Sequence, residues 1–418
     1  MVPYKVMQSL FFVIISVLAC VILTFFNKMG GYNSRTFASF DVRNSETDLS
    51  TGDRSINVSN RTQHKNRTHL WTWFSLRAFW LNQNMVPERY DCQNGIVNFQ
   101  RADINSSKFR RSKVVIFAGG FKDKSLWKRL LAKRTPRQIW VFTTDESPLT
   151  TMDYIPPKQY NIGRNIFNVT YTYHSKSDIS VPYGRYKPYV TFNDDEIDVD
   201  YHKLHHKFAM WMSSHCDTIS WDRTKFVKDL AEYMPIDRFG KCGNMTPKCE
   251  RRSSDCGWLQ RDYMFILAFE NSCCEEYISE KFWKVLSTGV SIPVVIGAKK
   301  EDYKRLGPPN SFIHVDDFNS MEDLATYLQR VANNSVLYNS FFKWKKFGTV
   351  SQTEFLDRRI VYNKSACLLM DFLKNGVPEK KETLDLYGSS WLGGCKGCSS
   401  KAWIAKYGYT PGKHFTAN

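Results

Sequence analysis

The sequence predicts an α/β fold with two domains, and three observations lead to this prediction. Short, continuous apolar runs alternate with segments whose apolar residues recur at helical spacing. Polar residues follow several of these runs directly, and open α/β sheets bind their ligands at that end of a strand. The chain of 418 residues is long enough for two domains with appendages.

The N-terminal region is expected to be a membrane anchor followed by a stem. Residues 10–26 are apolar apart from Ser16 and Thr24. The length of this run is at the lower limit for a membrane span. A cleaved signal peptide is the alternative, but the apolar run continues beyond the small residues that would form its cleavage site. We therefore expect residues 1–8 to be a cytoplasmic tail, 9–26 a single transmembrane signal-anchor and 27–68 a disordered luminal stem.

Composition also favours a luminal glycoprotein. The formal charge of +17 comes without a zinc-finger, homeodomain or RNA-recognition motif, which argues against nucleic acid. Eleven cysteines are typical of an oxidising compartment. Cys20 lies in the anchor, and the pairing of the other ten is left open. The disulfide candidates singled out are Cys242, Cys249, Cys256, Cys395 and Cys398. The N-glycosylation sequons are at Asn57, Asn60, Asn66, Asn105, Asn168, Asn244, Asn333 and Asn363.

The first domain is expected over residues 69–205. Residues 113–118 and 139–143 are predicted to be strands, and residues 125–132 the helix between them. Glu146 follows the second strand closely. The acidic stretch 194–200 is expected near the domain boundary.

The second domain is expected over residues 206–374. Strands are predicted at 208–214, 265–269, 291–296 and 312–315, and a helix at 223–233. Ser279 is expected to cap a further helix that begins at Glu280 and ends at Gly289. Ser320 is expected to cap another helix. Residues 375–418 are expected to be a C-terminal tail with a Cys-x-x-Cys pair; a zinc site there would need a second pair at matching spacing.

Several motifs resemble those of one enzyme family. Phe269-Glu270-Asn271-Ser272, Cys274, Tyr277 and Ser279-Glu280-Lys281 closely resemble the signature of the α1,3-fucosyltransferases, GDP-fucose-dependent inverting enzymes of glycosyltransferase family ten. Ser279 replaces the family's usual threonine. Glu146-Ser147-Pro148, Ser177-Asp178-Ile179 with Pro182-Tyr183-Gly184, and Phe239 to Gly243 resemble further blocks, so that the similarity extends over about residues 92–328.

The resemblance implies an architecture, a reaction and a location. The architecture is the GT-B type, two Rossmann-like domains facing a cleft. The reaction moves L-fucose from GDP-β-L-fucose to a hydroxyl of N-acetylglucosamine on a glycoprotein or glycolipid glycan. The location is the Golgi membrane, single-pass type II, with the catalytic domain in the lumen. The resemblance does not identify the acceptor glycan.

Roles for individual residues follow from the same motifs. Glu146 is the expected general base, and Glu280 the second catalytic residue, close to the fucose ring. Lys281 and Arg223 are expected to bind the diphosphate, since a helix N-terminus and guanidinium groups both suit phosphate. Tyr277, Asn271 and Glu270 are expected to line the donor site. His174 and His215 are alternative bases, although neither follows a strand end so closely.

No metal is expected to be required, because the adjacent pairs Asp194-Asp195 and Asp316-Asp317 make poor chelates in extended chain. Mn²⁺ or Mg²⁺ would at most stimulate, by helping product release. Two competing hypotheses remain, a non-catalytic luminal carbohydrate-binding glycoprotein and an inactive relative. A binding module has no need of a base together with a diphosphate clamp, which favours the enzyme.

Overall fold

The computed structural model describes residues 68–74, 89–93, 95–101, 104–121, 123, 125–157, 166–191, 199–216, 220–245, 259–352, 367–374 and 384–408. All of them belong to one unit of the chain, Ser59–Asn418. The predicted anchor, the sequons at Asn57, Asn60, Asn66 and Asn363, and the candidates Cys249 and Cys256 lie outside these ranges. The described residues contain no helix long and apolar enough to cross a membrane.

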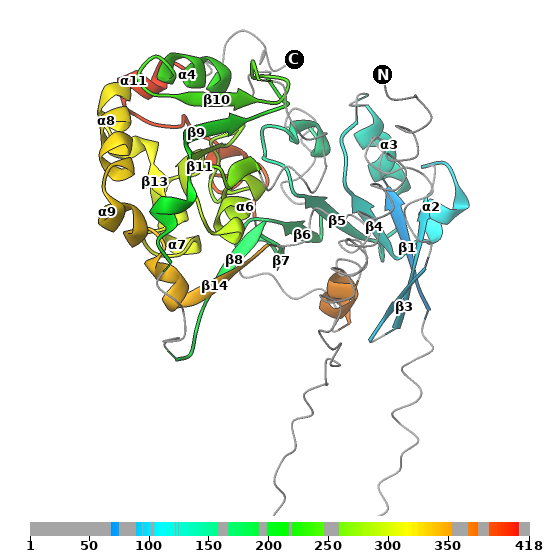
Figure 1. The fold of residues 1–418 in the computed structure, drawn as a ribbon. Helices are drawn as coiled ribbons and strands as arrows, with labels where there is room; N and C mark the ends of the chain where they lie inside the picture. Colours follow the sequence, from blue (N-terminus) through cyan, green and yellow to red (C-terminus); the bar gives the residue numbers. More distant parts are fainter. Residues whose placement is uncertain are drawn as a thin grey trace, which may run out of the picture. The chain divides into compact units, whose positions relative to one another are not determined.

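The first sheet has seven strands in the order β2-β3-β1-β4-β5-β6-β7 (Figure 1). All neighbours are parallel except β2, which is antiparallel to β3. The strands are β1 Thr68–Phe74, β2 Arg89–Cys92, β3 Gly95–Arg101, β4 Val114–Phe117, β5 Ile139–Thr144, β6 Val169–Thr172 and β7 Ile179–Ser180. Its described helices are α2 Ser107–Arg111 and α3 Leu126–Lys133.

The second sheet has five strands, all parallel, in the order β10-β9-β11-β12-β13. The strands are β9 Lys207–Met212, β10 Ile236–Phe239, β11 Tyr263–Phe269, β12 Ile292–Ile296 and β13 Ile313–His314. The chain leaves β9 in one direction across the sheet and returns in the other with β11. The gap between these two strands is therefore the topological switch point, where α/β sheets of this order bind their ligands.

Helices surround the second sheet, and a small ribbon adjoins it (Figure 1). The helices are α4 Arg223–Leu230, α6 Glu280–Thr288, α7 Lys300–Leu306, α8 Met321–Ala332, α9 Ser335–Ser340 and α11 Ala402–Ala405. Apolar residues of α4, α8, α9 and α11 pack with β9, β11 and β12 in one core cluster. The ribbon pairs β8 Gly184–Pro188 with β14 Gly348–Gln352, antiparallel.

The unit formed by β11, α6 and β12 agrees with the sequence prediction. All but one of the residues of β11 are buried, as expected for a strand covered on both faces. The Ser279 side chain accepts from the Lys281 N–H at the start of α6. Gly289 ends the helix with φ +68°, a left-handed conformation that glycine adopts without steric cost.

One core cluster contains residues of both large sheets. Phe117, Trp140 and Phe142 of the first sheet belong to the same cluster as Ala268 and Val295 of the second. Phe282 and Trp283 of α6 complete it from the side. The α/β class with parallel sheets is therefore confirmed, and apolar packing joins the elements that carry the two sets of motifs.

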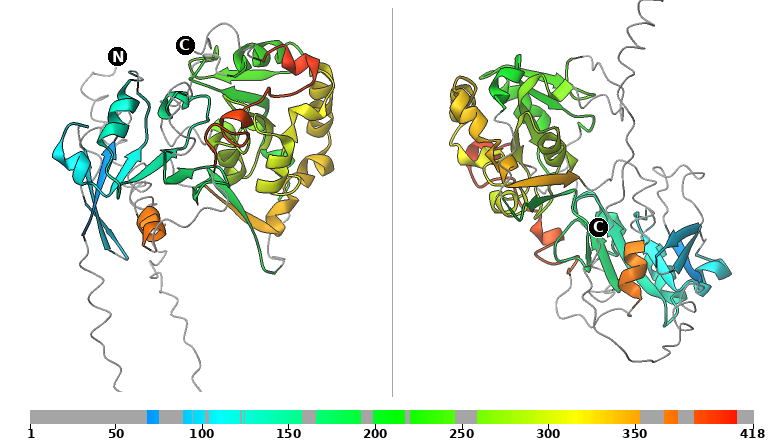
Figure 2. Two further views of the ribbon diagram at one scale, coloured as in Figure 1. Left: turned by 180° about the vertical axis from the view of Figure 1, so that it is seen from behind. Right: turned by 60° about the horizontal axis from the view of Figure 1, so that its bottom comes forward.

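The structure describes residues 384–408 of the expected C-terminal tail. Residues 384–408 pack into the protein, and Leu384, Trp391, Ile404 and Tyr407 are each buried. Figure 2 shows α11, in red, beside α4, where the Tyr407 ring contacts that of Phe226 at 5.1 Å between centroids. These few apolar residues are not apparent in a segment that is rich in glycine, lysine and serine. Disulfides hold the segment against the protein, which its composition alone would not predict.

Candidate active site

The candidate site begins at the switch point of the second sheet. The Arg223 guanidinium lies there and joins the ends of two strands. It donates to Phe269 O at the end of β11 (3.0 Å), and to Ser213 Oγ (3.0 Å) and His215 O (2.9 Å) just after β9. The residue is only 6% exposed, and burial lowers the pKa of Arg223 from its ordinary value. Three of its five N–H groups are thus used by protein oxygens, and at most two remain for a ligand.

Glu270, the first residue after β11, organises the start of α6. Its carboxylate is fully buried and accepts from the Ser279 N–H (2.7 Å) and the Ser279 hydroxyl (2.7 Å). Gly297 makes room for it: a Cβ on that residue would lie 2.6 Å from the Glu270 Cβ, and its φ of +155° is itself unfavourable for other residues. Glu270 is thus held by Ser279, the residue that caps α6.

Lys281 lies in the first turn of α6 with three oxygen partners. Its ammonium donates to Ser279 Oγ (2.8 Å), Glu270 Oε2 (3.1 Å) and Glu280 Oε1 (3.2 Å), which uses all three of its donors. Burial alone would lower the pKa of Lys281, but the two carboxylates outweigh burial and raise it. The side chain, 26% exposed, therefore stays charged, and a helix N-terminus adds to its attraction for anions.

Glu280 is the most accessible member of this cluster. Its side chain is 44% exposed, whereas that of Glu270 is not exposed at all. Burial by itself would raise the pKa of Glu280, but the charge and hydrogen bond of Lys281 lower it below the ordinary value. Glu280 is therefore an ionised carboxylate at the surface of the cluster.

Glu146 comes from the first sheet and meets the second at Tyr277. The Tyr277 hydroxyl, on a residue only 2% exposed, donates to Glu146 Oε2 at 3.1 Å. Burial and the neighbouring Asp145 raise the pKa of Glu146, whereas Lys281 and the Tyr277 hydroxyl oppose this. The structure therefore brings together Glu146, Tyr277, Glu280 and Lys281, four of the residues that the sequence analysis selected.

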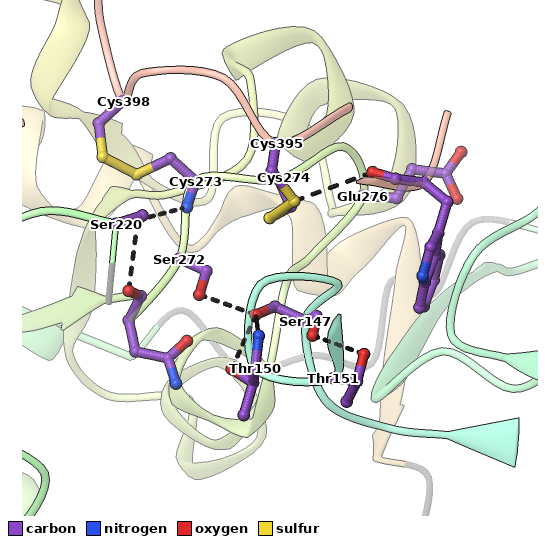
Figure 3. Close-up of a disulfide and its surroundings, with 12 residues drawn as sticks. Ser147, Thr150, Thr151, Ser220, Ser272, Cys273, Cys274, Glu276, Cys395 and Cys398 are labelled. Atoms are coloured by element: carbon purple, nitrogen blue, oxygen red, sulfur yellow. Dashed lines mark hydrogen bonds between the residues drawn. A yellow bond between two sulfur atoms is a disulfide. The ribbon is translucent and has the colours of Figure 1, made fainter. Parts of the chain in front are cut away.

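A second contact joins the same two loops. The Ser147 hydroxyl donates to the Ser272 hydroxyl at 2.8 Å, as Figure 3 shows. Both residues are fully buried. Sequence reasoning named Ser147 and Ser272 only as motif members, because nothing in their spacing indicates contact across 125 positions. The two motifs fit one another through these hydroxyl groups.

Two adjacent disulfides fasten the loop between β11 and α6. Cys273 is bonded to Cys398 and Cys274 to Cys395, so that each member of the Cys-x-x-Cys pair reaches a different neighbour (Figure 3). The Glu275 N–H also donates to Gly394 O (3.2 Å). The loop between β11 and α6, called the site loop below, is therefore cross-linked to the C-terminal segment by two disulfides.

The remaining described cysteines form two further disulfides. Cys242 pairs with Cys216 and Cys92 with Cys367. The sequence analysis had Cys242 in its candidate group but gave it no partner.

The other predicted residues occupy varied surroundings. Asn271 is half-buried, and its side-chain oxygen is buried without a hydrogen-bond partner among the described residues, which leaves it able to accept from a ligand. His174 is fully buried and burial lowers its pKa, while His215 is exposed. The hydrogen bonds of Glu146 run to other residues: its N–H donates to Thr144 Oγ1 (3.0 Å) and its carboxylate accepts from Tyr277.

The described sequons differ in exposure. Asn105, Asn244 and Asn333 are exposed. Asn168 is half-buried, and its side-chain oxygen accepts from Arg134 (2.6 Å) and from the Trp140 N–H (2.8 Å). Within the ranges that the structure describes, no group of three His, Cys, Asp or Glu side chains is arranged to hold a metal ion.

Two family models match this chain in succession. The model described as "Fucosyltransferase, N-terminal" matches residues 63–184, and "Glycosyltransferase family 10 (fucosyltransferase) C-term" matches residues 202–388. Between them they take in both loops of the candidate site.

Individual relatives carry related names. "Glycoprotein 3-alpha-L-fucosyltransferase A" of Drosophila melanogaster is 34% identical over 239 residues, 56% of this chain and 45% of that protein. "Alpha-(1,3)-fucosyltransferase 4" of Bos taurus is 32% identical over 264 residues, 62% of this chain and 61% of that protein. The chain thus spans about half the length of the first of these relatives.

A solved structure titled "Crystal Structure of alpha1,3-Fucosyltransferase with GDP-fucose" is also similar. It has a TM-score of 0.46 and 14% sequence identity, and the match covers 79% of this chain and 96% of that one.

Proposed function

Because the chain belongs to glycosyltransferase family 10, the fucosyltransferases, we propose that it is an inverting α1,3-fucosyltransferase. It transfers L-fucose from GDP-β-L-fucose to a hydroxyl of N-acetylglucosamine on glycoprotein or glycolipid glycans. The single observation that carries this proposal is the contact of Glu146 with Tyr277, which brings a carboxylate beside the Glu280–Lys281 pair.

Glu146 serves as the general base in this proposal. Inversion requires one displacement, in which the acceptor hydroxyl attacks the anomeric carbon while GDP leaves from the opposite side. The acceptor proton passes to a carboxylate that must be ionised yet basic. A pKa raised by burial suits this task, since a base works best when its pKa lies near the operating pH.

Lys281 stabilises the diphosphate as it departs. Its ammonium has no spare donor, so it must exchange one partner when the donor binds. Glu280 is the partner given up, because its contact is the longest of the three and its side chain the most exposed. Glu280 is then free to hold a fucose hydroxyl and to favour positive charge at the anomeric carbon.

The switch point supplies the rest of the donor site. Arg223 offers its remaining N–H groups to phosphate, and Asn271 offers its unpartnered oxygen to a donor group of the nucleotide or sugar. Glu270 acts on the donor site indirectly, because its carboxylate holds Ser279 and Lys281 in place. Charge neutralisation by Lys281 and Arg223 makes a catalytic metal unnecessary, and Mn²⁺ or Mg²⁺ acts at most as a stimulator.

The wider setting belongs to the same proposal. The two sheets form a GT-B pair, residues 69–205 on the acceptor side and 206–374 on the donor side. The enzyme is a single-pass type II protein of the Golgi membrane, anchored by residues 9–26 and carried on the stem 27–68. The acceptor is either a Lewis-type antenna or the core of an N-glycan.

The test uses the full chain, expressed in eukaryotic cells and solubilised in detergent. It is incubated with GDP-fucose, EDTA and a panel of N-glycans and lactosamines, and products are analysed by mass and linkage. We expect an α1,3-fucosylated product that is lost in Glu146→Gln and Lys281→Ala and kept in Glu275→Gln, a matched change outside the cluster. Absence of transfer by folded protein, with or without Mn²⁺, would favour a carbohydrate-binding or inactive protein.

A further inference from the structure

Glu276 occupies an unusual position next in the chain to Tyr277, which contacts the candidate base. Its φ of +55° lies in the left-handed region, which costs a residue with a side chain roughly 1–2 kcal/mol. Glycine would occupy the position without that cost. The side chain is nonetheless almost completely buried, at 5% exposure. A glutamate held there against its backbone preference points to a purpose for its carboxylate.

The carboxylate connects loops of the two sheets. Glu276 Oε2 accepts from the Ser175 N–H (2.6 Å), and Oε1 accepts from the Ser175 hydroxyl (2.6 Å), just after β6 of the first sheet. From the other side Oε1 accepts from Arg305 of α7 (2.6 Å). The Glu276 N–H donates to Asp302 of the same helix (3.0 Å). Four hydrogen bonds therefore hold this one residue between the first sheet and α7.

The next residue in the chain is Tyr277, which contacts the base. Its backbone is fixed on both sides, because the Tyr277 N–H donates to Cys274 O (3.2 Å) and the Ile278 N–H donates to Glu276 O (2.9 Å). The position of the Tyr277 hydroxyl therefore depends on where Glu276 is anchored. That hydroxyl is the donor to Glu146.

We propose that Glu276 is a positioning residue, whose clamp on Ser175 and Arg305 holds the Tyr277 hydroxyl against Glu146 and so sets the pH at which the base becomes active. It touches neither substrate nor reacting atoms. The inference rests on the proposed function, since it concerns the base of that reaction.

The charged and titratable groups around the carboxylates of Glu146 and Glu276 influence the pKa of each. Glu146 is faced by Asp145, Tyr277, Glu280 and Lys281, with Tyr173 and Tyr183 within electrostatic reach. Glu276 is faced by His174, Ser175, Asp302 and Arg305. Burial would raise the pKa of Glu276, but the Ser175 donors, His174 and Arg305 lower it, so the clamp stays ionised where the base titrates.

The test is the pH profile of kcat/KM for fucose transfer by the full chain. A hydrogen bond donated to a carboxylate favours its ionised form, so its loss should raise the apparent pKa of Glu146. We expect the acidic limb of the profile to move upward by roughly one pH unit in Glu276→Gln. Tyr277→Phe should produce a shift of the same sign, and the double variant no more than the larger single shift.

Two further variants separate positioning from folding. Glu276→Gly suits the left-handed backbone and removes the whole side chain, so it should shift the profile in the same direction as Glu276→Gln. Glu275→Gln, the same chemical change one position earlier, should leave the acidic limb unchanged. GDP affinity should stay within about threefold of wild type in Glu276→Gln, because the contacts of Lys281 do not involve Glu276.

The outcomes are distinct. An active wild type with an acidic limb that is the same in Glu276→Gln and Glu276→Gly would overturn the positioning role and leave the proposed function intact. A folded wild type that transfers no fucose at all would overturn the proposed function, and this inference with it.

Discussion

Replacement of Glu270 by glutamine tests whether the buried ion pair holds the start of α6. The substitution removes the charge opposite Lys281 and turns one carboxylate oxygen into a donor. That donor then faces either the Ser279 N–H or the Ser279 hydroxyl and Lys281 ammonium. A buried pair that loses one partner typically costs about 3–5 kcal/mol. The lower end applies here, because Lys281 is 26% exposed and keeps Glu280 as a partner.

A loss of about 3 kcal/mol corresponds to a fall of roughly 6–12 °C in the melting temperature of a domain of this size. Thermal unfolding of the full chain, followed by fluorescence at pH 7 without reductant, measures it. The double variant Glu270→Gln, Lys281→Met is the matched control. Removal of both charges should bring stability back to within about 1 kcal/mol of wild type. A double variant as unstable as the single one would refute the ion pair as the source of the loss.

Four further outcomes are expected, from three variants. Glu146→Gln should lower kcat by roughly 10²–10⁴-fold if Glu146 is the base, with GDP affinity retained in a titration. Since burial raises the pKa of Glu146, its ionised form costs stability above the unfolded pKa, so the same variant should melt higher than wild type at pH 7 and equally at about pH 4. Gly297→Ala should displace Glu270 and lower both the melting temperature and the donor affinity; unchanged values would show that the loop yields without effect. Cys398→Ser should destabilise by only about 2 kcal/mol in urea unfolding, because the adjacent Cys274–Cys395 disulfide keeps the long loop closed and only a short ring is opened.

Local patterns were sufficient to predict four of the five strands of the second sheet, whereas the edge strand β10 was not predicted. The apolar run of β11, the cap at Ser279 and the stop at Gly289 are each encoded within a few neighbouring residues, and the structure has them where expected. The resemblance of the motifs likewise selected the residues that meet at Tyr277. These predictions succeed because the residues that determine each feature lie in the same short segment as the feature itself.

Contacts between distant segments could not be predicted in the same way. The sequence marks Cys395 and Cys398 as a pair, yet each bonds to a different residue of the site loop. The sequence analysis gives Glu276 no role, because its left-handed backbone and its partners depend on α7 and on Ser175. Glu270 was expected to line the donor site, whereas its complete burial and its bond to Ser279 depend on how the loop closes on β11.

The adjacent cysteines of the site loop have a consequence for biosynthesis. Cys273 leaves the ribosome 125 residues before its partner, which at typical translation rates corresponds to roughly 6–25 s. During that time two neighbouring thiols lie open to incorrect pairing, and the loop between β11 and α6 lacks its fastening. Maturation of this protein should therefore depend on disulfide isomerases after translation of the C-terminal segment. A cell with weakened isomerase activity should accumulate chains in which the two sheets are formed but the loop between β11 and α6 is not correctly bonded.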